Sequence, residues 1–149
     1  MADAVAHPGK TPWHLWVVGV MAVLWNAIGV MDFTLTELGN EAYLKAFTPE
    51  QLAYFKGFPL WSVIAWGAGV YGGFIGSGLL LARQRWAGPV FLLSIVGVIL
   101  TSLYSHVLTD AGKVLGGGAG AAVFAAIIFV IAVLLWLYAR ALAQRGVLR

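Results

Sequence analysis

An aspartate interrupts an apolar part of this chain. Asp32 directly follows residues 11–31, which contain no Asp, Glu, Lys or Arg. A carboxylate inside a membrane segment is costly to desolvate, so it is a functional candidate by default. If the segment is a helix, Trp25, Gly29 and Asp32 share one face by their i, i+4, i+7 spacing. Asn26 lies on an adjacent face, nearer the middle of the apolar stretch.

A second polar group lies in the third apolar stretch. Ser102, His106 and Asp110 follow one another at intervals of four residues, which predicts that they share one stripe of a helix. Alternating helices of a bundle run in the same direction, so Asp32 and His106 are expected at a similar depth. We expect the two side chains to face each other across the bundle.

A carboxylate beside an imidazole can do three things, and the sequence leaves all three open. The pair can relay or sense protons, because histidine titrates near physiological pH. It can bind a solute or a cation in a cavity that opens outward. It can also join its two helices through interhelical hydrogen bonds worth about 0.6–2 kcal/mol.

Other chemistries find less support in the sequence. His106, Asp110 and Asp32 supply at most one nitrogen and two oxygens, whereas zinc sites use more His or Cys. The chain has no cysteine, no phosphate-binding loop, no HExxH and no Ser-His-Asp arrangement. We therefore predict no metal, no cofactor and no enzymatic activity. The lack of a basic patch interleaved with aromatic residues also predicts no nucleic-acid partner.

Four uncharged stretches must position these side chains. Each is long enough for a membrane-spanning helix, which needs about 20 apolar residues. The chain is 61% hydrophobic and 10% charged, whereas soluble domains are about 25% charged. The sequence predicts an all-α, polytopic membrane protein: one domain over 1–149, a four-transmembrane-helix bundle in contact with the lipid bilayer, with helices at 13–36, 59–82, 87–109 and 119–140.

The longest connector contains a helix-start signal. Thr48 can cap a helix, Pro49 suits its first position, and Gln51 can complete a capping box. The signal predicts a short amphipathic helix over 49–57 on the outer membrane surface. This helix either ties its neighbours together or acts as a lid over a substrate site.

The second apolar stretch is rich in small residues at intervals of four. Such rows let helix backbones approach closely in lipid. The expected partner is a matching row at Gly118, Ala122 and Ala126, and the alternative is a second protomer or a larger membrane complex. The rows contain Ala65, Gly69, Gly73 and Ser77, and Ala68, Gly72 and Gly76.

Basic residues divide unequally between the two predicted sides of the membrane. Cytoplasmic loops carry an excess of Lys and Arg, so the richer side is predicted to be cytoplasmic and to carry both termini. That side has Lys10, Arg83, Arg85, Arg140, Arg145 and Arg149, and the other has Lys45, Lys56 and Lys113.

Several segments resemble a group of small bacterial four-helix inner-membrane proteins, some of which carry the label "sugar transporter". The resemblance implies a bacterial inner-membrane location, and it carries over no binding or catalytic residue. Its segments are Trp13-His14-Leu15-Trp16, Trp25-Asn26, Asn40-Glu41-Ala42-Tyr43-Leu44, Phe47-Thr48-Pro49-Glu50-Gln51 and Gly57-Phe58-Pro59.

Two functions remain compatible with the sequence. In the first, the chain is a non-enzymatic packing or accessory subunit that associates through its Gly/Ala face, as a homo-oligomer or within a larger complex. In the second, it is a small solute transporter or proton-coupled permease. The second function would use Asp32 and His106, with Asn26, Ser102 and Asp110 nearby.

Overall fold

A computed structural model describes residues 10–149, so the first nine residues of the predicted domain lie outside the described residues. Four long helices run up and down, and each is long and apolar enough to cross a membrane. The chain is thus an all-α, multi-pass membrane protein by helix length and composition, as predicted. The four helices are α1 (Trp13–Glu37), α4 (Leu60–Leu81), α5 (Ala87–Leu103) and α7 (Ala119–Gln144).

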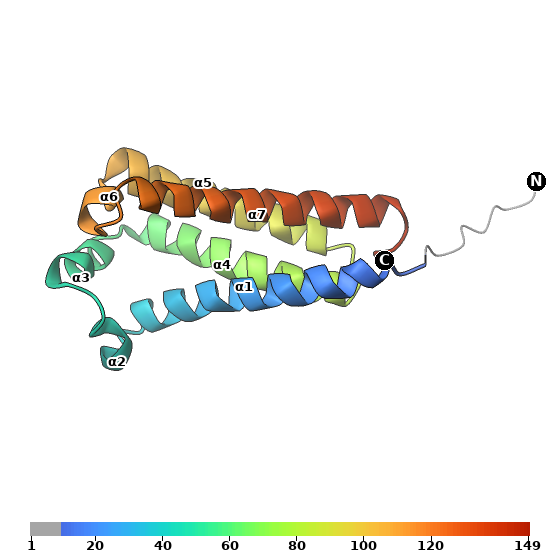
Figure 1. Ribbon diagram of the computed structural model, residues 1–149, viewed down its shortest axis with the longest axis horizontal. Coiled ribbons are helices and arrows are strands. Elements are labelled where there is room, and N and C mark those ends of the chain that lie inside the picture. Colours follow the sequence, from blue (N-terminus) through green and yellow to red (C-terminus); the bar gives the residue numbers. More distant parts are fainter. Residues whose placement is uncertain (1–9) are drawn as a thin grey trace, which may run out of the picture.

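The two ends of the bundle carry different segments (Figure 1). The start of α1 and the C-terminus lie at one end, called here the terminal end. The opposite end, called the loop end, carries the short helices α2 (Glu41–Leu44), α3 (Pro49–Lys56) and α6 (Ala111–Val114). Helix α3 has the predicted capping box at Thr48 and Gln51.

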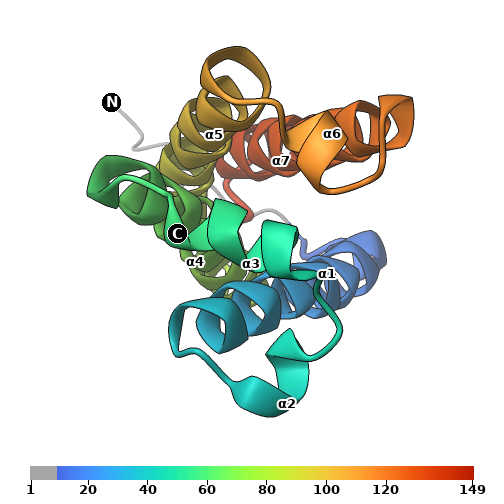
Figure 2. The same ribbon diagram turned by 90° about the vertical axis from the view of Figure 1, so that its left-hand side faces the viewer.

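The four long helices form a curved row rather than a closed square. Helix α1 packs along α4, α4 along α5, and α5 along α7, whereas α1 and α7 make far fewer close contacts. A view from the loop end shows α1 and α7 on either side of the open part of this row (Figure 2). The seam between α1 and α7 is therefore the weakest in the bundle.

Glycines bring α4 and α5 together. A Cβ added to Gly97 would lie 2.5 Å from the carbonyl oxygen of Ala65 and 2.5 Å from the backbone nitrogen of Gly69, so the backbones touch at this crossing. Gly72 and Gly76 face Ser94 and Phe91 of α5 in the same way. The expected partner of this small-residue row was helix 119–140, and that expectation is wrong. The row packs against α5, and Gly73 packs against Asn26 of α1.

Side chains and backbone close the terminal end. The buried cluster includes Leu15 of α1, Leu80 of α4 and Leu142 of α7, together with Val147 and Leu148 of the C-terminal segment. That segment also pairs with the α4–α5 turn, since the Arg149 amide donates to the Arg83 carbonyl and the Arg85 amide donates to the Arg149 carbonyl. His14 and Tyr138 hydrogen-bond across α1 and α7.

Helix α5 changes its winding at the loop end. The predicted helix over 87–109 is α-helical only to Leu103, and a π-helical turn, η1 (Tyr104–Leu108), follows. Thr109 is extended and ends the helix. A π-turn rotates the side chains that follow it away from the regular stripe, which affects the position of Asp110.

Candidate functional site

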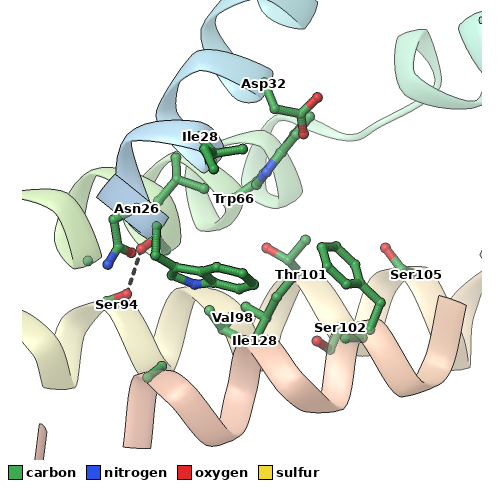
Figure 3. Close-up of a pocket in the computed structure, with 18 of the residues that line it drawn as sticks. Asn26, Ile28, Asp32, Trp66, Ser94, Val98, Thr101, Ser102, Ser105 and Ile128 are labelled. Atoms are coloured by element: carbon green, nitrogen blue, oxygen red, sulfur yellow. Dashed lines mark hydrogen bonds between the residues drawn. The ribbon is translucent and has the colours of Figure 1, made fainter. Parts of the chain in front are cut away.

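A cavity of about 500 Å³ lies between the four long helices, on the concave side of their row. Asp32 and His106 both line it, as do Asn26 and Ser102. Figure 3 shows Asp32 of α1 on one side of the cavity and Thr101, Ser102 and Ser105 on the other. The structure thus brings four of the five candidate polar residues to one space.

Asp32 is held by a tyrosine that the sequence did not single out as a site residue. The Tyr43 hydroxyl donates a hydrogen bond of 2.5 Å to Oδ1 of Asp32. Burial, together with the hydrogen bond to Asp32 and its negative charge, raises the pKa of Tyr43 to about 12. The phenol is therefore protonated at neutral pH and remains a donor. Tyr43 itself lines the cavity.

Tight turns bring Tyr43 back over the end of α1. Gly39 adopts a φ of +67°, which favours glycine, and reverses the chain after α1. Asn40 then caps α2 by accepting from the Tyr43 amide at 3.0 Å. A Gly-Asn pair after a long apolar run was the available signal for this turn.

His106 and Asp32 share the cavity without an ion pair between them. The His106 side chain is exposed, and its Nδ1 lies 3.2 Å from the Ser102 carbonyl oxygen. No side-chain hydrogen bond of Asp32 other than the one from Tyr43 occurs within residues 10–149. Both groups therefore present polar atoms to the cavity.

Asp110 lies outside the cavity, contrary to the expected stripe. It forms an ion pair of 2.6 Å with Lys113 and caps α6 by accepting from the Lys113 amide. The hydrogen bond to Lys113 is the main cause that lowers the pKa of Asp110. Because the π-turn and extended Thr109 precede it, Asp110 does not continue the face of Ser102 and His106.

Asn26 and Ser94 form polar joints between helices. The Asn26 amide donates to the Ala22 carbonyl at 2.8 Å and to Ser77 Oγ of α4 at 3.3 Å. Ser94 Oγ donates to the Gly69 carbonyl at 2.5 Å, linking α5 to α4. Both residues line the cavity, and each makes one hydrogen bond to α4, whereas the bond from Asn26 to Ala22 stays within α1.

The cavity has a polar end and an apolar end. Asp32, Tyr43, Ser105 and His106 lie toward the loop end, because they belong to the last turns of α1, to α2 and to η1. The interior toward the terminal end is lined by apolar side chains, namely Phe91, Ile128, Ala132 and Leu135.

The cavity opens between α1 and α7. Ile28 and Met31 of α1 and Phe124 of α7 line it and are also exposed on the molecular surface. Trp25 approaches Phe124 across this seam with ring centroids 6.5 Å apart. A space of this volume and polarity can hold a small molecule with one polar end. Within residues 10–149, no group of three or more His, Cys, Asp or Glu could hold a metal ion.

Comparisons with known protein families, with curated proteins and with solved structures found no match.

Proposed function

We propose that this protein is a small-solute transporter that holds its substrate in the cavity between α1, α4, α5 and α7. One observation carries the proposal: Asp32 and His106 line a single space of about 500 Å³. Unfilled volume in a helical protein costs packing energy. A subunit whose only role is packing gains nothing from such a space, whereas a carrier requires it.

The contrast between the two ends of the bundle supports transport over static binding. The terminal end is closed by the Leu15–Leu142 cluster and the His14–Tyr138 hydrogen bond. The polar end of the cavity lies at the loop end. A carrier needs access to its site from one side at a time. A closed terminal end, with an opening between α1 and α7 at Ile28, Met31 and Phe124, fits a state that admits solute through the half of the bundle nearer the loop end.

The competing accessory-subunit function loses one of its supports. It relied on the small-residue face of α4 to receive another protein. In this chain Gly69, Gly72 and Gly76 pack against α5 instead. A partner would have to use another surface.

The distribution of basic residues supports an orientation for this carrier. Six Lys and Arg residues belong to the terminal end and three to the loop end, the same sets that the sequence assigned to the two sides. By the positive-inside rule, we place the termini in the cytoplasm and the cavity opening on the outer side.

The test is to block the cavity with a larger side chain on α7 and to compare it with the same side chain on the exposed face of α7. Ala125→Phe places a ring in the cavity, because Ala125 lines it. Val123→Phe is the matched control, since Val123 lies on the same helix and is 58% exposed. Both variants and the wild type are placed in phosphatidylcholine nanodiscs, and empty nanodiscs are subtracted.

Native mass spectrometry then records co-purified small molecules, and equilibrium binding is measured with the uncharged probe neopentylbenzene. We expect the wild type and Val123→Phe to bind saturably and Ala125→Phe to lose binding. Equal binding by all three proteins, or saturable binding by none, contradicts the proposal.

Proteoliposome flux of any co-purified molecule then separates a carrier from a static binding protein. Only a carrier moves the molecule across the membrane, and Ala125→Phe should lose that flux. A stoichiometric larger membrane protein in the same spectra would favour the accessory-subunit function.

A further inference from the structure

We infer that the cavity selects an organic cation, namely a small ammonium-type head group attached to an apolar body. This inference rests on the proposed function and names its substrate class. It follows from the juxtaposition of one carboxylate, several aromatic rings and an apolar interior in one space.

Asp32 supplies the negative charge without a protein cation beside it. Within residues 10–149 the ion pair formed is Asp110–Lys113, and no Lys or Arg lines the cavity. The Tyr43 hydrogen bond reaches Oδ1, and Oδ2 receives no hydrogen bond from the described residues. A carboxylate in a low-dielectric space favours an opposite charge nearby. A cationic ligand supplies that charge.

Aromatic rings surround the same space. Trp25, Trp66, Tyr43 and Phe124 belong to three of the long helices and to α2, and all four line the cavity. Figure 3 shows Trp66 on the same side of the cavity as Asp32. The negative faces of such rings attract quaternary and other weakly hydrated ammonium groups. Rings and carboxylate therefore favour the same charge.

The apolar part of the lining disfavours a highly polar substrate. Phe91, Val98, Ile128 and Leu135 offer no hydrogen bond to a ligand. Ser94 already donates to the Gly69 carbonyl, and the Asn26 amide donates to Ala22 and Ser77. The free hydroxyls of Ser102 and Ser105 lie on one side of the cavity only. A sugar, with hydroxyl groups on all sides, would leave many of them unpaired against these walls. An anion would meet Asp32, with His106 as the one basic side chain lining the cavity.

Three probes of one shape separate charge from size. Benzyltrimethylammonium is the cation, neopentylbenzene replaces its nitrogen by carbon, and phenylmethanesulfonate carries the opposite charge. Binding is measured by equilibrium dialysis against nanodiscs of zwitterionic lipid, which do not concentrate cations at their surface. The pH is mildly alkaline, at which free histidine is neutral.

Two aspartates at the same end of the bundle give a matched pair of variants. Asp32→Asn removes the charge in the cavity and keeps an acceptor for Tyr43. Asp110→Asn removes an exposed charge outside it. We expect Asp32→Asn to weaken benzyltrimethylammonium binding by about 10- to 100-fold, the loss for a hydrogen-bonded or paired charge. Asp110→Asn should change it less than about twofold, since exposed charges are screened.

The neutral probe separates the failure of this inference from the failure of the proposed function. Neopentylbenzene should bind the wild type and Asp32→Asn alike and should be lost in Ala125→Phe. If both probes bind with equal affinity and Asp32→Asn changes neither, the charge selectivity is wrong and the cavity function stands. If phenylmethanesulfonate binds best, the selectivity is also wrong. If no probe binds saturably, both proposals fail. Asp32→Glu keeps the charge and should retain the preference for the cation, which guards against a loss of binding through misfolding.

Discussion

The α4–α5 seam and the α1–α7 seam show how side-chain size decides whether two membrane helices meet. At the first seam Gly69 faces Gly97, and the backbones are in contact. At the second, Trp25 faces Phe124, and two large rings separate the backbones. Lipid chains supply no hydrophobic drive to pull helices together, so close packing does most of the work. The small residues therefore close one seam, and the large rings leave a cavity at the other.

A thiol in the cavity and a thiol buried on α4 should show the largest difference in reactivity. The natural chain has no cysteine, so single-cysteine variants react at one place. Ser102 lines the cavity, whereas Ser62 of α4 has 0% exposure. We expect Ser102→Cys to react with a methanethiosulfonate ethylammonium reagent on the order of 100-fold faster, because a buried thiol reacts only through rare opening. The rates are measured by mass spectrometry.

The unmodified wild type serves as the unlabelled control for these rates. Both serines lie in the half of the bundle nearer the loop end, so lipid depth differs little between them. Similar reaction rates for the two thiols would mean that the reagent does not reach the cavity. The cavity would then be as closed as the buried position on α4.

A methyl group at the glycine crossing should destabilise the packed seam. The Cβ of Gly97→Ala would lie 2.5 Å from two backbone atoms of α4, neither of which is the end of a flexible side chain. Overpacking of this kind costs about 1–3 kcal/mol. Gly88→Ala is the control on the same helix, because nothing lies within 4 Å of its added Cβ. Reversible unfolding in a fixed micelle composition measures both variants.

We expect the unfolding free energy of Gly88→Ala to equal that of the wild type or to exceed it by up to about 1 kcal/mol, since alanine is the better helix former. An unfolding free energy for Gly97→Ala that equals that of Gly88→Ala would show that α4 and α5 separate without cost. The packed seam would then not be the rigid part of the molecule.

The two seams should also differ in the value of a single serine hydroxyl. Ser94→Ala removes the hydrogen bond to the Gly69 carbonyl across α4 and α5. Interhelical hydrogen bonds in membranes are worth about 0.6 kcal/mol on average and up to about 1.7. Ser102→Ala is the counterpart at the cavity, where Oγ has no hydrogen bond to residues 10–149. In the same unfolding assay, Ser94→Ala should lower the free energy of unfolding, and Ser102→Ala should leave it unchanged.

Hydrophobic runs made the long helices predictable. The predicted span 13–36 differs by one residue from Trp13–Glu37, and 59–82 differs by one residue at each end from Leu60–Leu81. Helix α7 continues to Gln144 beyond the predicted end at 140. Arg140 ends the uncharged run, but the four residues that follow it, Ala141-Leu142-Ala143-Gln144, still favour a helix. Thr48 and Gln51 located α3, since a capping box is a local signal.

The features that the sequence did not predict depend on three-dimensional geometry rather than on a local sequence pattern. Helices α2 and α6 have four residues each and are too short for a hydrophobic period. The π-turn at Tyr104–Leu108 has no residue signature, and it moved Asp110 out of the predicted stripe. Asp32 and His106 were placed at one depth from chain direction alone. The contact between Tyr43 and Asp32 was not predicted, because it depends on a turn at Gly39. That turn lies in the connector between the first and second apolar stretches, where no hydrophobic pattern marks it.

The smallest expected effect concerns the hydroxyl that holds Asp32 at the mouth of the open seam. The pKa of Tyr43 is raised from 10.0 to about 12, first by burial and then by the hydrogen bond and charge of Asp32. Because the pKa is raised in the folded protein, the protonated Tyr43 phenol stabilises the fold. This contribution to the free energy of unfolding is fully present below pH 10 and is lost as the pH rises toward 12. The difference in absorbance at 295 nm between the wild type and Tyr43→Phe isolates this one phenol from the four other tyrosines.

We expect that difference to titrate near pH 12 in the wild type and at a lower pH in Asp32→Asn, because the charge is removed while the burial remains. Asp110→Asn should leave the titration unchanged, since that carboxylate pairs with Lys113. A midpoint at 10 in the wild type would mean that Tyr43 is solvated and that α2 does not hold Asp32. The carboxylate at the open seam would then be mobile, whereas the polar groups of the packed seam stay fixed between their helices. A fixed Asp32 instead keeps Oδ1 bonded to Tyr43 and leaves Oδ2 free of hydrogen bonds from the described residues, which is the arrangement that the proposed selection of a cation requires.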